Sequence, residues 1–442
     1  MNFKLSTYII PSIISMVLVG TYTNIDGFFI GNVTGDSGLA AINIVWPIVA
    51  FITSLGTGLG VGGSVMLNKM RGTGDERAAE QVKATMLFLL VAVGVLAGAI
   101  LKLTYEPLLK LMGAEGQVLV YSIDYADIVC IGALFQILGS GLVALLRNEQ
   151  KTYFSMVCCI VGLIVHLLLD MLLVDEYKLK GVAISTVISQ AVIMLLCLFA
   201  LRAKKTLDKV QTEEENSVKW WQKPFKNINR EYLLPILGAS TSPFGINFVP
   251  SIVLLFTNYF ALEVGGTAAV SAYAVMSYAV YTFDYIYQGV CDGVQPILSY
   301  CCGAKDKDGE NRALRSSAII LGAFTIGFIA LTPALIAVMP KLFAVSLEAE
   351  KMMTSGFILY AIAYPFKAAV KFVCSYYYAV GKTKPSNLLI YADPLVFTPL
   401  FLIILPMLWD MDGIWLSMTF AQVCVATLGG LSLWRTFQKN KE

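Results

Sequence analysis

The chain has 442 residues, of which 57% are hydrophobic and only 14% are charged, and its mean hydropathy is +0.71. This composition excludes a soluble globular protein and indicates a polytopic membrane protein. A net charge of +2 gives no indication of a nucleic-acid partner. All nine cysteines lie in apolar stretches without a CxxC pair, so we expect buried thiols and neither disulfides nor metal ligands.

Long apolar segments, each of roughly 20 residues or more, predict twelve transmembrane helices. The first of them continues without a small-residue cleavage site, so we expect a span and not a cleaved signal. In chain order, the expected spans are residues 6–31, 39–68, 82–105, 118–146, 153–174, 181–201, 231–262, 269–302, 314–340, 353–380, 386–409 and 413–436.

The polar stretch 202–230 divides these spans into two sets of six. We therefore expect an N-terminal lobe at 1–201, a linker at 202–230 and a C-terminal lobe at 231–442. Of the 30 basic residues assigned to loops and termini, 24 fall in the termini and the even-numbered connections. By the positive-inside rule, both termini and the linker face the cytoplasm of a cell (inner) membrane.

The two halves of the chain also repeat each other. A shift of 231 positions without a gap places residues 41–72 on residues 272–303. Six spans per half predict parallel repeats related by a pseudo-twofold axis along the membrane normal, an arrangement found in transporters whose substrate path lies between the halves. The matched pairs include Gly58 with Gly289, Gly62 with Gly293, Gly72 with Gly303 and Asp75 with Asp306.

Short motifs occur along the whole chain at 22–31, 39–41, 56–63, 147–151, 169–170, 181–190, 295–300, 303–304 and 378–384. In their order and spacing they resemble the multidrug and toxic compound extrusion (MATE) family. The resemblance implies an all-α antiporter, not an enzyme and without a cofactor, that exports drug-like and often cationic organic compounds. It further implies that export is coupled to an inward flow of protons or sodium. We expect a monomer in contact with membrane lipid.

Two acids in the first half lie at similar depth in the membrane. Asp26 is about 33 Å and Asp170 about 28 Å along its helix from the cytoplasmic side, and Tyr22 and His166 each precede their Asp by one turn on the same face. Ionisable groups inside spans are costly unless they have a partner or a function, so these four residues predict a proton or cation site. In another interpretation, the two acids only end their helices at the outer interface.

The family resemblance favours the functional interpretation. It implies that an acid of the first span and one of the fifth bind the coupling cation, here Asp26 and Asp170, with Tyr22 and Thr186 as oxygen ligands. His166 stands where family members often have Asn, and an imidazole titrates near neutral pH, which favours protons. Both ions need carboxylates, however, and a lone buried His is often only hydrogen-bonded. A single His is not expected to build a metal site, which leaves sodium at the two acids.

The eighth predicted span carries a polar stripe with intervals of three or four residues, which places its members on one helix face. We expect this face to line a central cleft and bind the substrate, with its acids attracting cations. Alternatively, Lys367 and Lys371 of the tenth span neutralise Asp284 and Asp292 as buried ion pairs, and the two interpretations are compatible. The stripe consists of Tyr281, Asp284, Gln288, Asp292 and Gln295.

A lipid-linked oligosaccharide flippase is the alternative function, because that class has similar helix bundles. It would need a cleft rich in Arg and Lys for a pyrophosphate group, whereas Lys367 and Lys371 are the only basic residues expected in the spans away from their ends. A membrane-embedded hydrolase is disfavoured because the chain has one His and neither an HExxH nor a GxSxG motif.

Overall fold

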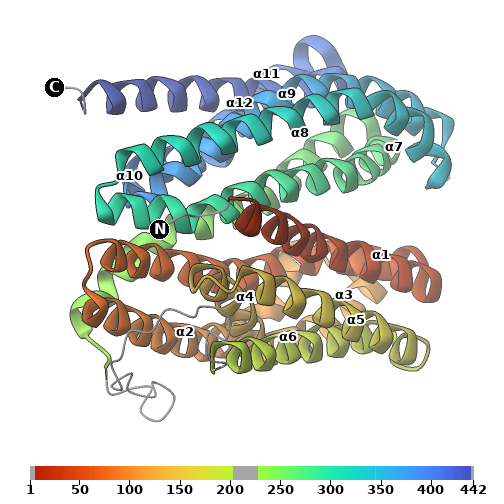
Figure 1. The fold of residues 1–442 in the computed structure, drawn as a ribbon. Coiled ribbons are helices and arrows are strands. Elements are labelled where there is room, and N and C mark those ends of the chain that lie inside the picture. The colour runs from red at the N-terminus through yellow and green to blue at the C-terminus, as the bar shows by residue number, and fades with distance from the viewer. Residues whose placement is uncertain (1–4, 203–226, 344, 440–442) are drawn as a thin grey trace.

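The structure, a computed structural model, describes residues 5–202, 227–343 and 345–439. Within these ranges the chain is helical and contains no β-strand. The helices form two bundles that lie side by side, with α1 to α6 in one lobe and α7 to α12 in the other (Figure 1). The boundaries predicted for the lobes and the linker stay a prediction. Of the linker predicted at 202–230, residues 203–226, including Lys204, Lys205, Lys209, Lys219, Lys223 and Lys226, lie outside the described residues.

The first lobe begins with its longest helix, which runs through two predicted spans. Its helices are α1 (Ser6–Gly72), α2 (Glu76–Leu111), α3 (Gly116–Ile131), α4 (Ala133–Asn148), α5 (Thr152–Tyr177) and α6 (Leu179–Arg202).

The second lobe follows the same plan, again with two predicted spans in its first long helix. One of its spans contains a π-helical turn, η3. Its elements are the 3₁₀ turn η2 (Arg230–Tyr232), α7 (Leu233–Ala304), α8 (Lys307–Leu342), α9 (Leu347–Ala379), α10 (Thr383–Ala392), η3 (Asp393–Phe397), α11 (Thr398–Ile404) and α12 (Pro406–Lys439).

These helices provide twelve membrane crossings. Ten helical segments are long and apolar enough to cross a membrane, with α1 counted as two segments, Ser6–Gly35 and Ser37–Gly72. The pair of α3 and α4, bent by 59°, supplies an eleventh crossing. One of the ten, Arg230–Ala304, has 75 residues and is broken at Gly266, so it crosses twice. For the described residues, the prediction of an all-α membrane protein with twelve helices in two six-helix lobes is confirmed.

The loops predicted after the first and seventh spans are reduced to single breaks in long helices. Gly35 breaks α1 with φ 62° and ψ −150°, and Gly266 breaks α7 with φ 63° and ψ −155°. Side chains rarely adopt such positive φ values, so glycine is favoured at both breaks. A shift of 231 positions relates the two glycines, which extends the sequence repeat to this hinge.

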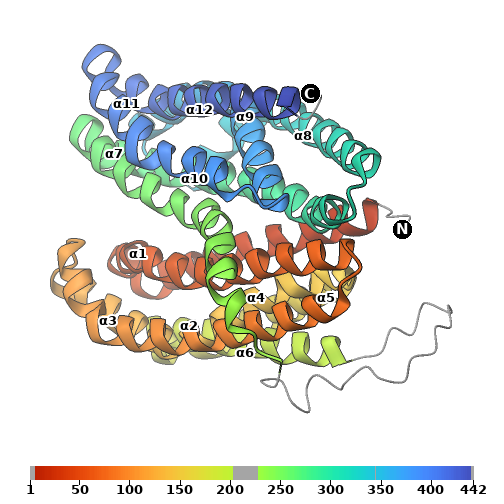
Figure 2. The same ribbon diagram turned by 90° about the vertical axis from the view of Figure 1, so that its left-hand side faces the viewer.

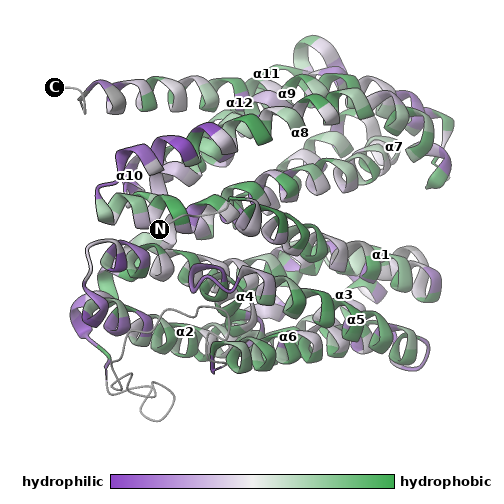
Figure 3. Ribbon diagram, viewed as in Figure 1, coloured by the Kyte–Doolittle hydropathy of each residue, from purple (hydrophilic) through white to green (hydrophobic). Residues whose placement is uncertain are grey.

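Large apolar side chains face outward around the bundle. Hydrophobic residues cover the middle of the helices, and hydrophilic residues gather toward their ends (Figure 3). A monomeric soluble protein rarely exposes so much apolar surface, whereas a bilayer covers it. The exposed set includes Leu103, Leu172, Phe199, Leu234 and Ile326.

Both described ends of the chain and the two ends that flank residues 203–226 lie at the same end of the bundle, which we call the terminal end (Figure 1). Figure 2 shows the same arrangement from a second direction. The breaks at Gly35 and Gly266 lie about one membrane thickness away, at what we call the far end.

The glycines of the sequence repeat form the contact between the lobes on the terminal half. A Cβ on Gly62 would lie 2.6 Å from the backbone nitrogen of Ser240 in the other lobe, and a Cβ on Gly293 would lie 2.7 Å from the Cα of Ile9. Gly58, Gly72, Gly289 and Gly303 meet the opposite lobe in the same way. The repeated glycines therefore let two helix pairs approach closely across a pseudo-twofold axis.

The acids at the end of the repeat have matching structural roles. Asp75 accepts a hydrogen bond from the backbone nitrogen of Ala78 at 2.9 Å, and Asp306 accepts one from Gly309 at 2.8 Å. Each carboxylate caps the N-terminus of a helix, α2 or α8, where it satisfies a free backbone donor. The repeat thus preserves elements of the scaffold.

Candidate functional site

A cavity of about 290 Å³ lies between the two lobes. Residues of both lobes line it from the middle of the bundle toward the far end, where Asn43, Asn258 and Val270 form part of its wall. The glycine contacts described above close the space between the lobes at the terminal end. The cavity therefore extends toward the far end of the bundle.

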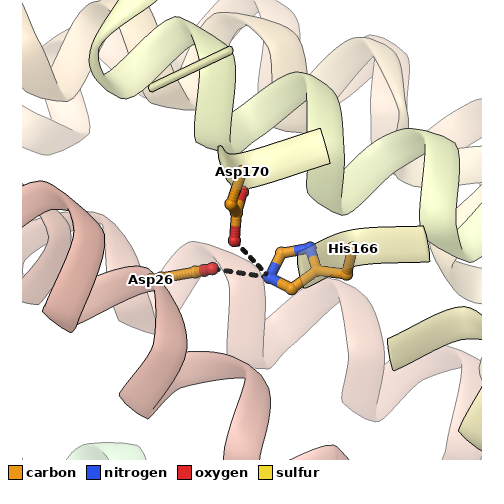
Figure 4. A group of neighbouring side chains, drawn as sticks. All are labelled: Asp26, His166 and Asp170. Atoms are coloured by element: carbon orange, nitrogen blue, oxygen red, sulfur yellow. Dashed lines mark hydrogen bonds and ion pairs between the residues drawn. The ribbon is translucent and has the colours of Figure 1, made fainter. Parts of the chain in front are cut away.

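Asp26, His166 and Asp170 form a compact cluster in the first lobe. Asp26 comes from α1, and His166 and Asp170 lie one turn apart on α5 (Figure 4). The Nε2 atom of His166 is 2.7 Å from Oδ1 of Asp26 and 3.2 Å from Oδ2 of Asp170. The predicted juxtaposition of the two acids and the imidazole is therefore present in the structure.

The cluster is buried, but one of its members reaches the cavity. Asp26 is 7% exposed and lines the cavity, whereas His166 and Asp170 are fully buried behind it. An ion or proton entering from the cavity meets Asp26 first. The imidazole then connects Asp26 to Asp170.

The two predicted oxygen ligands lie beside this cluster. The ring of Tyr22 packs on the ring of His166 with centroids 4.6 Å apart, and Thr186 donates its hydroxyl to the carbonyl of Val182 at 3.0 Å. Both residues line the cavity. Among the described residues neither forms a hydrogen bond to Asp26 or Asp170, so their role as ligands stays a prediction.

Tyr125 of α3 is a further member of the site that sequence reasoning missed. Its hydroxyl donates a hydrogen bond to Oδ2 of Asp26 at 3.4 Å, and its side chain also lines the cavity. A single tyrosine inside an apolar span has no distinguishing pattern, so only the three-dimensional arrangement identifies it.

The cluster brings together atoms of the kinds that bind cations. One atom from each of Asp26, His166 and Asp170 can be chosen so that all three lie within 4.8 Å of one another. A single His supplies one ligand, and the two carboxylates supply the other two of this set. Two ionised carboxylates at this distance repel each other, so the arrangement favours a proton or a bound cation between them.

The polar stripe of the second lobe is divided between two environments. The members nearer the far end, Tyr281, Asp284 and Gln288, line the cavity. Lys367 of α9 forms an ion pair with Asp284 at 2.9 Å, which confirms one of the two predicted pairs. Tyr281 donates its hydroxyl to the carbonyl of Pro250 at 3.3 Å.

The members nearer the terminal end, Asp292 and Gln295, lie in the contact between the lobes and do not belong to the described cavity wall. Arg147 of α4 forms an ion pair with Asp292 at 2.9 Å, and Asn148 donates to Oε1 of Gln295 at 3.1 Å. The prediction that Lys371 pairs with Asp292 is wrong, because Asp292 already has Arg147 as its base. Asp292 and Gln295 therefore join the lobes at the closed end of the cavity.

Arg147 was assigned by sequence to a connection, but the structure buries it. The residue is 3% exposed and belongs to α4, one position before that helix ends. Arg147 is therefore a buried basic residue at the cavity that was not expected from the sequence. A partner for it was not recognisable, since Asp292 lies 145 positions further along the chain.

Glu149, two residues further along, anchors the loop after α4. Lys83 and Arg71 each approach its carboxylate at 3.1 Å. Burial alone would raise the pKa of the Glu149 carboxyl, but the two positive charges outweigh burial and hold the pKa below its usual value. This ion-pair network fixes the segment that carries Arg147.

Comparison with known proteins agrees with this fold. The multidrug export protein MepA of Staphylococcus haemolyticus is 22% identical over 428 residues, which cover 95% of this chain and 90% of that protein. MepA of Staphylococcus saprophyticus is 24% identical over 293 residues, which cover 66% of this chain and 62% of that protein, or less than two thirds of its length.

Solved structures share the fold at low sequence identity. A MOP superfamily transporter from Pyrococcus furiosus, whose binding pocket is described as having reversed polarity, has a TM-score of 0.89 at 20% identity over 99% of this chain and 96% of its own. A multidrug resistance MATE family transporter in an outward-facing conformation has a TM-score of 0.87 at 21% identity over 99% and 96%. A sequence model of the MatE family matches residues 11–172 and 244–396, well over half of the sequence, and the chain therefore belongs to this family.

Proposed function

We propose that the protein is a cation-coupled antiporter that exports drug-like organic compounds by alternating access. The observation that carries this proposal is the cluster of Asp26, His166 and Asp170 at the wall of the cavity between the lobes. Family membership and the named MepA relatives support export of small molecules. In this proposal the cluster is the coupling site, and the cavity that Asp26 lines is the space for the substrate.

In the proposed cycle, binding of the coupling cation to Asp26 and Asp170 in the first lobe promotes release of the substrate. Two carboxylates in a buried cluster repel each other unless a proton or cation lies between them. In the conformation described, the cavity extends toward the far end, which we assign to the outside of the cell. A cation that enters there neutralises Asp26 and Asp170, and the loss of negative charge promotes release of the substrate. The neutralised cluster then permits the lobes to close around the emptied cavity.

We extend the proposal to orientation: the protein is a monomer in the cell membrane with the terminal end in the cytoplasm. The excess of basic residues at that end supports this direction. In a cysteine-free background, Ser217→Cys is expected to react only from the cytoplasm and Thr267→Cys only from outside. Labelling of both positions from outside intact cells would refute the orientation.

Cationic substrates were expected because Asp284 and Asp292 would attract them. In the structure each of these acids has a basic partner, Lys367 or Arg147. The two pairs cancel the attraction on which that expectation rested. We therefore propose export of drug-like compounds without restricting them to cations. The flippase alternative was disfavoured because few basic residues were expected near the cleft. Since Lys367 and Arg147 are basic groups near the cavity, a transport measurement tests this alternative better than composition does.

The test uses purified protein in proteoliposomes that are loaded with a fluorescent dye. Two dyes are compared, ethidium as a cation and a rhodamine that carries a free carboxylate. Proton and sodium gradients are imposed separately, and at least one is expected to drive efflux of at least one dye. Asp26→Asn should lower this efflux to the level of empty liposomes. Asp127→Asn is the matched control, because Asp127 pairs with Lys102 in the same lobe but outside the cavity wall. Failure of both gradients to drive either dye would refute the proposal.

A further inference from the structure

The charges around the cavity are almost all paired. Asp284 pairs with Lys367 and Asp292 pairs with Arg147, each at 2.9 Å. Asp26 lies 2.7 Å from the Nε2 atom of His166. Within the described residues, Lys371 is the basic residue of the cavity wall that forms no ion pair. This ammonium group is half-buried and lies inside the expected membrane region, where a charge without a counter-charge is costly.

Lys371 lies where two cavities meet. A smaller cavity of about 80 Å³ is enclosed by the second lobe, and Lys371 lines both this space and the large cavity between the lobes. Its Nζ donates to Oε1 of Gln288 at 3.3 Å. A lysine ammonium has three donors, so this single neutral acceptor leaves capacity for a further partner. Lys371 lines the cavity in which a substrate would bind, so the substrate could be this partner.

The neighbouring acid of the smaller cavity does not take this role. Asp393 accepts hydrogen bonds from Thr398 and from Gln422, both at 2.7 Å. It forms no ion pair with Lys371 in the described part of the chain. Two neutral donors therefore satisfy Asp393 and leave the Lys371 ammonium available.

We infer that Lys371 binds the carboxylate of an amphipathic organic substrate. The substrate class would then include aromatic acids and zwitterions in addition to any neutral compounds. A carboxylate at this position would supply the missing counter-charge through a charge-assisted hydrogen bond. Trp46, Tyr278 and Tyr285 line the same large cavity and offer flat apolar surface for an aromatic ring system. This inference rests on the proposed export function and specifies its substrate.

The experiment compares two dyes that differ in one group, tetramethylrhodamine with a free carboxylate and its methyl ester. Dissociation constants are measured by fluorescence anisotropy with purified full-length protein and no ion gradient. The wild type is expected to bind the free acid about tenfold more tightly than the ester, as one charge-assisted hydrogen bond predicts. Lys371→Gln and Lys371→Met should abolish this preference, whereas Lys371→Arg should retain it.

Two controls separate the carboxylate contact from general effects. The ester lacks the anionic group, so its unchanged affinity in the Lys371 variants reports that they are folded. Lys102→Gln removes a positive charge outside the cavity wall and should leave the preference at about tenfold. Equal binding of the two dyes by the wild type would overturn the inference, and so would a preference that survives in both Lys371→Gln and Lys371→Met.

The result is independent of the test of export. Binding without a gradient examines only the contact to Lys371, while gradient-driven efflux examines coupling. Gradient-driven efflux of the ester, together with equal binding of the two dyes, would reject the inference and retain the antiporter. Selective binding of the acid without gradient-driven efflux of either dye would reject the antiporter and retain the binding site.

Discussion

The two lobes share a repeat but treat their buried acids differently. In the first lobe, Asp26 and Asp170 share one imidazole, that of His166. In the second lobe, Asp284 has its own lysine, and Asp292 has an arginine that comes from the other lobe. The first lobe thus contains a cluster with more acidic than basic groups, whereas Asp284 and Asp292 of the second lobe each have their own base.

This difference indicates which acids are available for coupling. Arginine and lysine keep their charge near neutral pH, so an acid paired with one of them is already neutralised. Asp26 and Asp170 have no such permanent partner and share one imidazole, so in the proposed cycle they are the acids that exchange a proton or another cation. The features that the repeat retains, the glycine contacts and the helix-capping acids, belong to the scaffold. The proposed coupling chemistry lies where the halves diverge.

The largest effect is expected from removing Arg147, the base of the first lobe that pairs with Asp292 of the second lobe. Arg147→Met leaves Asp292 buried without a counter-charge, and breaking such a pair costs about 3–5 kcal/mol. The folded fraction after purification should fall sharply, as measured by size-exclusion chromatography and thermal denaturation. Arg147→Met combined with Asp292→Leu should recover most of the loss, because neither charge then remains.

The matching change in the first lobe sharpens this contrast. Asp26→Asn removes one of two acids that share an imidazole, so it relieves repulsion while losing a hydrogen bond worth about 1 kcal/mol. Its folded fraction should stay near that of the wild type. If Asp26→Asn destabilises the protein as much as Arg147→Met does, the two lobes do not differ in the way described.

The number of spans and the cluster of the first lobe follow from local patterns. Apolar length identifies the spans, and the four-residue spacing of His166 and Asp170 places them on one face of α5. Their approach to Asp26 followed from equal depth in the membrane. The distances within the cluster, and the contact of Tyr125 with Asp26, depend on how the helices pack. The spacing of residues along the sequence does not predict this packing.

Partners of charged residues were the least predictable feature. Arg147 stands next to polar residues at the end of a helix, so its sequence context matches that of a loop residue. Only the approach of the two lobes brings it to Asp292. Likewise, Gly35 and Gly266 were placed in loops, because a single positive-φ break in a helix has the same sequence signal as a short turn.

A smaller effect is expected where the halves agree. Gly62→Ala and Gly293→Ala each place a methyl group against the backbone of the opposite lobe, and such overpacking costs about 1–3 kcal/mol. Both should lower thermal stability and slow transport to a similar degree, since the pseudo-twofold axis relates them. Gly238→Ala is the control, because nothing lies within 4 Å of its added Cβ. Sensitivity of only one half would show that the contact is not symmetric in function.

The decisive measurement is gradient-driven dye efflux by Asp26→Asn, Asp170→Asn and the double variant in proteoliposomes with matched amounts of protein. Because both acids serve one site, each single variant should fall to the level of empty liposomes, and the double variant should lose nothing further. Efflux near the wild-type rate in either single variant would contradict the assignment of coupling to this cluster. Partial losses that add up in the double variant would contradict it as well.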